Sequence, residues 1–436
     1  MKLDIYVQNR HVGILDQVDV SNYVFSYLPG TPSEFAVSLG MPVRTESWSH
    51  RVLHPIFQIS LPEGSLKESI KRKYAKHVKH FGDTELLAIV GSHLVGRVKA
   101  VPAGTSPQLD APSKSLQALL IDSPQELIDH FVGEHLQSSG VSGGFPKVLS
   151  RSPVDTDGSR STLTFDHWIL KLNDEDHPDL VLNEYFGLTL AKKMQLPVPE
   201  FHLSNDAQRI AIKRFDINND GLQMGFEDVC ALGGLGASEK FSGSLERVIK
   251  TISSYCSPLN VRNSLEQLYA QYLACMAIRN GDAHLKNFGL IYSNFSDARL
   301  SPAYDMLSMS AYAPHAQNGD ALDAPALSLG GVHRWFSEKN VDQFAILCRV
   351  NAAKKTIIKD KLCLALEDTA REILEMTHSR PSFQPMAKRM LELWSFGAKI
   401  HDIQVSEKIG MMAEAIPIPK IEDSEPIFLR SIPRQR

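Results

Sequence analysis

One short stretch, RNGDAHLKNFGLIY at residues 279–292, constrains the fold of this chain more than any other. It places Asp282, His284, Lys286 and Asn287 within six positions, directly before an apolar run. The segment in front of it is also apolar. Its apolar residues recur at helical spacing at Leu265, Leu268, Tyr272, Cys275 and Ile278. A short loop after a buried helix can direct several polar side chains into one cleft, so the pattern predicts a functional loop.

Length and composition indicate a globular protein with more than one domain. The chain has 436 residues, which predicts two or three domains. Hydrophobic residues make up 43%, charged residues 22%, and the formal net charge is -4. These values are ordinary for soluble proteins and argue against a general nucleic-acid-binding chain, although they leave a local basic patch open.

The cysteines and the N-terminus bear on the compartment. The 5 cysteines are scattered and include no C-x-x-C pair, so neither a disulfide framework nor a zinc site is expected. The opening MKLDIYVQNRHVGIL lacks the order of a secretion signal, and no apolar run approaches the roughly 20 residues of a membrane-spanning helix. We expect a cytoplasmic protein that does not contact the membrane.

The pattern changes along the chain from strands to helices. Strands are predicted at residues 3–7, 11–15 and 94–101, and a Pro- and Ser-rich linker at 102–115. A strand, a turn at Asp157-Gly158, a second strand, a helix at 183–196 and a strand at 208–216 are expected next. From about residue 226 to 400 the pattern is mostly helical. We therefore predict an N-terminal α+β subdomain at 1–110, a second subdomain at 117–225, a helical lobe at 226–405 and an extended tail at 406–436.

A β-rich half followed by a helical half is how a two-lobed kinase would be arranged. In protein kinases the catalytic Asp lies five positions before an Asn that binds Mg²⁺, and a second metal-binding Asp follows. Here Asp282 precedes Asn287 by five positions, and LSPAYDMLSM supplies Asp305 after a predicted strand–turn–strand. Asp and Asn are also common in helix caps and turns, so only the three residues in this order favour phosphoryl transfer.

The upstream half supplies candidates for nucleotide binding. Lys171 ends an apolar strand, from which a cation can reach the α- and β-phosphates, although such a Lys is often merely solvated. Glu184 opens the next helix, where it either pairs with Lys171 or complements the helix dipole. The segment IKRFD follows a strand and is a candidate hinge for adenine, with Asp216 near the ribose; the alternative is a simple strand end.

A loop of small residues, SSGVSGGFPK at 138–147, is a candidate for phosphate binding. Gly143 and Gly144 allow backbone N–H groups to approach a phosphate closely, and Lys147 ends the loop. The loop lacks the Walker spacing and is a weak signal by itself.

Together these segments resemble the HipA-type serine/threonine kinases, the toxins of HipA–HipB toxin–antitoxin modules. The resemblance covers roughly residues 1–400. Its most specific parts are GDAHLKN and PAYDMLS, and it also includes the N-terminal strand pair, SLPEGSLKESIKRKY, VGRVKAVP, the Gly-rich loop, NEYFGLTLAKKMQLPVP and IKRFD. It implies an α+β, two-lobed, phosphoinositide-kinase-like fold with a β-rich N-terminal lobe of two subdomains and an all-helical C-terminal lobe.

The resemblance also implies ATP with Mg²⁺ and a role for each matching residue. Asp282 would be the catalytic Asp, Asn287 and Asp305 the metal ligands, and Lys171 the phosphate-binding Lys. The remaining nucleotide contacts would come from Tyr304 stacked on the adenine, His284 beside the nucleotide, and Lys213 and Phe215 flanking the hinge backbone.

Two positions depart from the family pattern. Several members carry an autophosphorylated Ser seven residues before the loop Lys, and Gly140 stands at that position here. Ser138, Ser139 and Ser142 lie nearby, so autophosphorylation has either been lost or moved. The hinge carries Lys213 where the family has an acidic residue.

The implied function is phosphorylation of a serine in a protein substrate, which for this family is an aminoacyl-tRNA synthetase such as glutamyl-tRNA synthetase. The implied partners are a HipB-like helix-turn-helix antitoxin and, through that complex, operator DNA. Two alternatives remain from the residues: a small-molecule phosphotransferase of the aminoglycoside-kinase type, which does not need the first ~100 residues, and a catalytically silent corepressor.

The run QSSGVSGG leads to a first prediction. Phosphate on Ser138, Ser139 or Ser142 would repel the phosphates of ATP, so the modified protein should be inactive. Mass spectrometry after incubation with Mg-ATP should detect phosphate in this loop. An unmodified loop in an active enzyme would show that Gly140 has removed this form of control.

Overall fold

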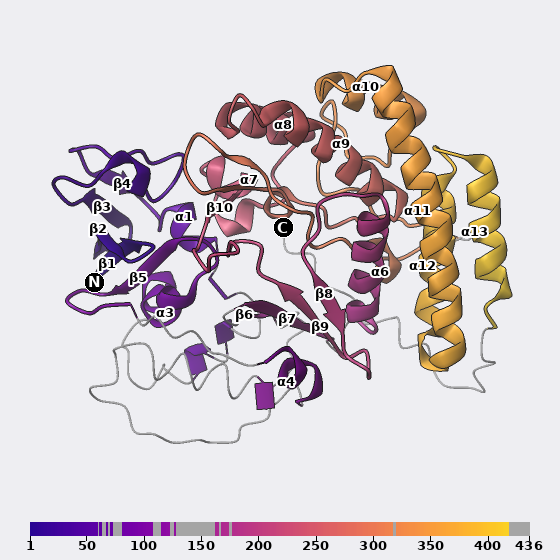
Figure 1. Ribbon diagram of the computed structural model, residues 1–436, viewed down its shortest axis with the longest axis horizontal. Helices are drawn as coiled ribbons and strands as arrows, with labels where there is room; N and C mark the ends of the chain where they lie inside the picture. Colours follow the sequence, from indigo (N-terminus) through magenta and orange to yellow (C-terminus); the bar gives the residue numbers. More distant parts are fainter. Residues whose placement is uncertain are drawn as a thin grey trace.

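The chain folds into an α+β molecule with two lobes (Figure 1). The computed structural model describes residues 1–59, 61–62, 67–68, 70–72, 81–107, 115–122, 126–127, 162–164, 167–173, 177–316 and 320–417. One hydrophobic core lies under the N-terminal sheet, and a larger one lies among the C-terminal helices. The expected fold class, α+β with two lobes, is confirmed.

The N-terminal subdomain is built on an antiparallel sheet of order β4-β3-β2-β1-β5. Alternate residues of β1 (Leu3, Ile5 and Val7) are fully buried, as expected for a strand with one face on a core. Its elements are β1 Lys2–Val7, β2 Arg10–Asp19, β3 Asn22–Tyr27, η1 Ser33–Phe35, β4 Trp48–His50, α1 Pro55–Gln58, α3 Asp83–Val90, η2 Gly91–His93 and β5 Val98–Pro102.

The second sheet has the order β6-β7-β9-β8 and lies between the two cores. Leu170 of β7 and Ala211 of β9 belong to the N-terminal core, whereas Ile210 and Ile212 of β9 belong to the helical core. The elements of this part are α4 Leu116–Ile121, β6 Thr162–Thr164, β7 Trp168–Leu172, α6 Leu180–Lys193, β8 Phe201–Leu203 and β9 Arg209–Lys213. The sheet therefore connects the cores.

The C-terminal lobe is mainly helical. The buried helix α9 lies at its centre, and α12 packs so closely on the end of α9 that a Cβ at Gly397 would lie 2.0 Å from the carbonyl oxygen of Ala277. Its elements are β10 Gly225–Asp228, α7 Val229–Leu232, η3 Ala237–Glu239, α8 Leu245–Tyr255, α9 Val261–Ala277, η4 Leu285–Asn287, β11 Gly289–Tyr292, β12 Arg299–Leu300, η5 Met309–Tyr312, α10 Glu338–Leu347, α11 Ala352–Ser379, η6 Pro381–Phe383, α12 Gln384–Ala398 and α13 Ile403–Ala415.

Three expectations about elements need correction. The C-terminal lobe is not all-helical, because β10, β11 and β12 form an antiparallel sheet within it. The extended tail was expected to begin at residue 406, but residues 406–415 belong to the helix α13, which ends at Ala415. The strand expected at 94–101 is only β5, because Gly96 adopts a φ of +89° and turns the chain just before it. The strands expected at 3–7 and 11–15 are confirmed.

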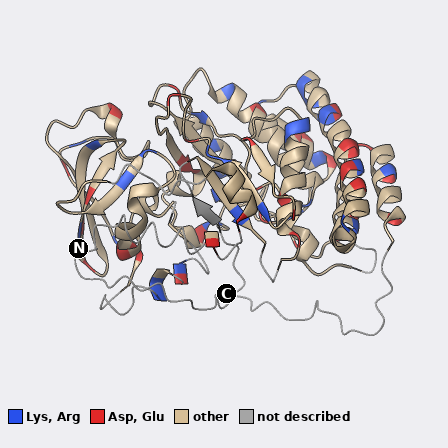
Figure 2. Ribbon diagram, turned by 60° about the horizontal axis from the view of Figure 1, so that its bottom comes forward, with Lys and Arg blue, Asp and Glu red and all other residues tan. Residues whose placement is uncertain are grey.

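The outer surface carries mixed charge. Figure 2 shows basic and acidic residues alternating along the C-terminal helices. Glu367 of α11 illustrates this, since it pairs with Arg371 of the same helix and with Lys408 of α13. Within the parts of the chain that the structure describes, no helix is long and apolar enough to cross a membrane.

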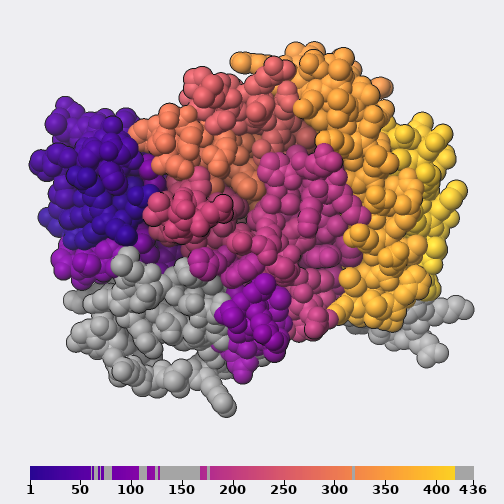
Figure 3. Space-filling view, viewed as in Figure 1, coloured from indigo at the N-terminus to yellow at the C-terminus, as the bar shows by residue number. Residues whose placement is uncertain are grey.

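The N-terminal subdomain is joined to the C-terminal lobe by a buried carboxylate. In Figure 3 the indigo N-terminal part abuts the pink and orange part of the C-terminal lobe without a visible gap. At this contact Glu227 of β10 is 1% exposed. It accepts hydrogen bonds from the Ser38 hydroxyl at 2.5 Å, the Leu39 N–H at 2.7 Å and the Tyr292 hydroxyl at 2.7 Å. Two of these donors belong to the N-terminal subdomain, so the carboxylate fastens the two parts together.

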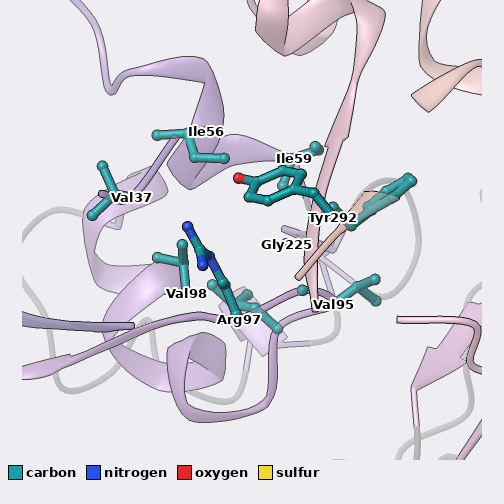
Figure 4. A pocket seen from close by; sticks show the side chains of 11 residues that line it. Val37, Ile56, Ile59, Val95, Arg97, Val98, Gly225 and Tyr292 are labelled. Atoms are coloured by element: carbon teal, nitrogen blue, oxygen red, sulfur yellow. The ribbon is translucent and has the colours of Figure 1, made fainter. Parts of the chain in front are cut away.

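A cation lies beside this carboxylate. The guanidinium of Arg97 is 4.9 Å from the centre of the Tyr292 ring, and its Nη2 donates to the Ala36 carbonyl at 3.0 Å. Figure 4 shows Arg97 and Tyr292 pointing toward one another into a small pocket whose apolar lining includes Val37 and Ile56. Burial raises the pKa of Glu227, while the hydrogen bond from Ser38 lowers it. The buried charge is thus balanced by donors from both parts.

This junction leads to a prediction about stability. Replacing Glu227 with Ala leaves three donors without their acceptor and removes the negative charge near the buried Arg97, which should lower the free energy of unfolding by about 3–5 kcal/mol. Glu227→Gln keeps an acceptor for Leu39 and Tyr292 and should lose much less. The control is Glu375→Ala, at an exposed glutamate. Urea denaturation of the three variants measures the differences.

The pH dependence of these proteins provides a second readout. Because the folded pKa of Glu227 is raised, the unfolded chain loses this proton first, and stability should fall as pH rises above the unfolded value of 4.5. Glu227→Gln should lack this component. An identical pH profile in wild type and Glu227→Gln would contradict the assignment.

Candidate active site

The loop after α9 presents Asp282 beside a set of buried polar groups. Its turn is made by the Asn280 side chain, whose Oδ1 accepts from the Asp282 N–H at 3.3 Å. The Nδ2 of Asn280 donates to the carbonyl of Asp305 at 3.1 Å. Asp282 is partly exposed, whereas Asn280 is 1% exposed. A buried amide therefore holds the catalytic-loop candidate against the segment of the second candidate Asp.

Asn287 and Asp305, predicted as metal ligands, lie side by side. The Nδ2 of Asn287 donates to Asp305 Oδ2 at 3.1 Å, and the Oδ1 of Asn287 accepts from the His284 N–H at 2.9 Å. Asp305 has a φ of +52°, a conformation uncommon for residues other than Gly. The backbone thus turns to bring this carboxylate to Asn287.

Lys171 occupies the centre of the site. Its ammonium donates to Glu184 Oε1 at 2.5 Å and also contacts Asp305 Oδ1. Glu184 is fully buried and Lys171 is 7% exposed. Of the two interpretations of Glu184, the pairing with Lys171 is therefore the one that the structure contains. Sequence patterns could not place Asp305 on the same ammonium, because 134 positions separate the two residues.

The helix that carries Glu184 is fixed to the chain just after Asp305. Asn183 Nδ2 donates to the Ser308 carbonyl at 3.1 Å, and the Ser308 N–H donates to Asn183 Oδ1 at 2.7 Å. One turn further along α6, a Cβ at Gly187 would lie 1.8 Å from the carbonyl oxygen of Met306, so only Gly fits. The segment NEYFG therefore contains two positioning residues, Asn183 and Gly187, that were not identified from the sequence.

The segment after Asp305 is also anchored to the base of the loop that carries Asp282. Arg279 has a φ of +56° and is 6% exposed. Its guanidinium lies 4.6 Å from the centre of the Trp335 ring and 3.5 Å from Asp320 Oδ1, and its carbonyl accepts from the Ser310 N–H at 3.2 Å. Arg279 is the first residue of the stretch RNGDAHLKNFGLIY, but nothing in the sequence indicated these partners.

Tyr304 and Phe215 form an aromatic platform. Their rings are stacked with centroids 5.7 Å apart, and Phe226 packs edge-on against both. The Tyr304 hydroxyl donates to the Lys286 carbonyl at 2.7 Å, which holds the ring against the loop that carries Asp282. Tyr304, predicted to stack on the adenine, and Phe215, predicted to flank the hinge backbone, therefore lie together, and Phe226 joins them.

His284 is buried under this loop. Burial, followed by the nearby Lys240, lowers its pKa to about 4, so the ring is neutral at pH 7. Its edge-on contact with Phe241 has a centroid distance of 5.2 Å. His284, two residues after Asp282, is therefore an uncharged side chain at pH 7.

The hinge residues separate into different environments. Lys213 extends outward at the end of β9 and pairs with Glu200 at 3.0 Å, with both side chains about half exposed. Asp216, expected near the ribose, is 1% exposed. Its Oδ1 accepts from Arg214 Nε at 3.0 Å, and its Oδ2 accepts from Arg214 Nη2 at 2.6 Å and from the Gly96 N–H at 2.7 Å. Because both of its oxygens are engaged, Asp216 connects the hinge candidate to the N-terminal subdomain. Its expected place near the ribose stays a prediction.

The Gly-rich loop lies outside the described residues. This applies to Gly143, Gly144 and Lys147 and to the candidate phosphorylation sites Ser138, Ser139 and Ser142. Their roles stay predictions.

The oxygen ligands of the site suit a hard divalent cation. Carboxylate and amide oxygens are what Mg²⁺ prefers, and it usually keeps waters and substrate phosphates as its other ligands. Asp305 and Asn287 carry such oxygens, but the Asn287 amide would have to turn to offer its own, because its Nδ2 donates to Asp305 and its Oδ1 accepts from the His284 N–H. Among the described residues, no group of three His, Cys, Asp or Glu side chains is placed to hold a metal ion. The pair therefore fits a metal that binds together with a phosphate compound. Lys171 would have to release Asp305 to such a metal.

Comparison with known proteins gives matches at the level of a family. Two family models match the chain: the HipA-like C-terminal domain over residues 139–379 and the HipA N-terminal domain over residues 3–101. In Sinorhizobium fredii, "Putative kinase Y4dM" is 29% identical over 339 residues (74% of this chain, 75% of the relative), and "Putative kinase Y4mE" is 24% identical over 332 residues (71% and 78%).

A solved structure shares the fold. It is the Shewanella oneidensis MR-1 toxin–antitoxin system of HipA, HipB and operator DNA, with a TM-score of 0.61, 16% identity and coverage of 94% of this chain and 96% of that one.

The buried ion pair leads to a prediction. Lys171→Met leaves the carboxylate of Glu184 buried without its cation and should lower the free energy of unfolding by about 3–5 kcal/mol, whereas Lys171→Met/Glu184→Leu should recover much of this loss. The exposed pair Lys213 and Glu200 is the matched control, where each change should be worth less than about 1 kcal/mol. Urea denaturation provides all values. Equal losses in the single and double variants at Lys171 would contradict the buried pairing.

Proposed function

The chain belongs to the HipA family, and from this premise we propose that it is a serine/threonine protein kinase that uses Mg-ATP. The observation that carries the proposal is the arrangement around Asp305. One carboxylate contacts both Lys171 and Asn287, and Asn280 ties its backbone to the loop of Asp282. Phosphoryl transfer requires a cation for the phosphates, two metal ligands and a carboxylate for the acceptor. Lys171, the pair Asn287 and Asp305, and Asp282 are groups of these types.

Each residue has a separate task in this mechanism. Lys171, oriented by Glu184, binds phosphate oxygens of ATP, and Tyr304 with Phe215 provides a stacking surface for the adenine. Asp305 and Asn287 would hold Mg²⁺, which when bound neutralises charge on the phosphates. These groups position ATP without reacting themselves.

Asp282 acts on the acceptor. It orients the serine hydroxyl and accepts its proton as the bond between the serine oxygen and the γ-phosphorus forms. The bond between that phosphorus and the β–γ bridging oxygen breaks, and ADP leaves. His284 is neutral at pH 7 because burial lowers its pKa to about 4, so it adds no positive charge beside this proton transfer.

The substrate and partners are proposed from the family. We propose an aminoacyl-tRNA synthetase, such as glutamyl-tRNA synthetase, as the protein substrate, because phosphate in an ATP-binding loop adds negative charge where ATP must bind. A HipB-like antitoxin is the proposed partner, and operator DNA would be bound through that complex. The solved HipA neighbour, which is a complex with HipB and operator DNA, supports this part.

Incubation of the purified protein with labelled ATP and a cell lysate tests the proposal. A labelled protein band, identified as a synthetase by mass spectrometry, is the expected result. Label transferred only to small molecules would favour the aminoglycoside-kinase alternative. A protein that binds operator DNA with its antitoxin but transfers no label would favour the corepressor.

Two substitutions separate the proposed roles. Asp282→Asn should keep Mg-ATP affinity while turnover falls by about 10²–10⁴-fold, because it removes only the base. Asp305→Asn should lose turnover together with the Mg²⁺ dependence of nucleotide binding. Asp360→Asn on the exposed face of α11 is the control. Nucleotide titrations with and without Mg²⁺ and phosphorylation rates check this. Wild-type turnover in folded Asp282→Asn would end this assignment.

A further inference from the structure

A loop between η3 and α8, residues 240–244, lies against the catalytic loop. The Leu285 N–H donates to the Lys240 carbonyl at 3.1 Å. Gly243 approaches the Leu285 side chain so closely that a Cβ there would lie 2.5 Å from Leu285 Cδ2. Leu285 is three residues after Asp282, so the loop is fixed to the reaction centre.

The other end of this loop is held by a second segment of the C-terminal lobe. The Leu245 N–H donates to the Ser328 carbonyl at 2.9 Å, and Glu246 Oε1 accepts from the Gly330 N–H at 2.7 Å. The loop is therefore anchored on two sides, and a side chain at its tip has a defined position.

The side chain at that tip is an exposed aromatic ring. Phe241 is 49% exposed although one edge packs on the buried His284, with centroids 5.2 Å apart. The Lys240 ammonium lies 5.2 Å from the centre of the same ring. Single exposed apolar residues are common on proteins. Phe241 differs because its ring packs on His284, which is two residues after Asp282, the group proposed to bind the acceptor.

The ring does not belong to the nucleotide platform. That platform consists of Tyr304, Phe215 and Phe226, which contact one another, whereas the described ring contacts of Phe241 are with His284 and Lys240. An exposed ring beside the catalytic loop but outside the platform is available to the other substrate.

We propose that Phe241 is a specificity-determining residue that contacts an apolar side chain of the protein substrate near its phosphorylated serine. The proposal rests on the proposed kinase function and deepens it, because it names a feature of the acceptor. Removal of one apolar contact in a recognition site typically changes discrimination by tenfold or more. The effect should appear in KM for the protein substrate, because the ring touches neither ATP nor the transferred phosphate.

The test uses the protein substrate identified by labelling in a lysate. Phe241→Ala should raise KM for that protein about tenfold while kcat changes by less than about twofold. Phe241→Leu, which keeps an apolar side chain, should restore most of the affinity. Leu259→Ala is the matched control, because Leu259 is also an exposed apolar residue, at 87% exposure, and lies between α8 and α9.

Three results would overturn the proposal: unchanged KM in Phe241→Ala, a loss confined to kcat, or an equal rise in the KM for ATP. The second would assign Phe241 to support of the catalytic loop, and the third would assign it to the nucleotide. Absence of any labelled protein with the wild-type enzyme would instead refute the proposed kinase function itself. If Phe241→Ala does not fold, Phe241→Leu and Phe241→Ser provide the same comparison.

Discussion

The site depends on the contact between α6 and the backbone that follows Asp305. Asn183 exchanges two hydrogen bonds with the backbone of Ser308, and Gly187 allows the helix to approach Met306 closely. Trp394 of α12 adds a hydrogen bond to the Ser308 hydroxyl at 2.6 Å. Because α6 carries Glu184, this contact sets the distance from Glu184 to Asp305. Lys171 can then reach both carboxylates from β7.

The electrostatics of the site follow from that spacing. A buried ammonium and a buried carboxylate are each unfavourable alone, and pairing makes their burial tolerable. Lys171 and Glu184 form such a pair, while Asp305, whose side chain is 30% exposed, faces outward from it. Two carboxylates therefore share one ammonium at the position where a phosphate-bound cation is proposed to enter.

The sequence located the candidate residues of the site, but it did not indicate most of their contacts. Asp282, Asn287 and Asp305 were identified because a fixed spacing within one loop and an apolar strand–turn–strand are local signals. The association of Lys171 with Asp305 depends on tertiary structure and has no local signal. The contacts of Asp216 had no local signal either, because nothing in the sequence indicated that Arg214 and the distant Gly96 donate to its oxygens.

The same distinction applies to the fold. The strand β1 was predicted from its apolar residues, which are buried on one face. The helix α9 was predicted from apolar residues at helical spacing, and it is buried on most of its faces. The start of β5 was misplaced, because Gly96 turns the chain with a φ of +89° just before the strand. A Cβ at Gly96 would lie 3.4 Å from the backbone nitrogen of Phe226, a neighbour that is distant in the sequence. The helix α13 was missed in a region where Pro417 and later prolines dominated the interpretation.

The carboxylate of Glu227 has a consequence for the order in which the chain is made. Ser38 and Leu39 emerge from the ribosome long before Glu227 and Tyr292, so their hydrogen-bonding groups stay solvated until the C-terminal lobe has been synthesised. The N-terminal sheet can form first, because its strand pairs are local apart from β5. Its surface toward the C-terminal lobe is covered only after β10 and β11 have been synthesised and have folded onto it. A ribosome that stalls between these points therefore leaves a nascent chain with an uncovered docking surface, which is a state that chaperones and proteases recognise.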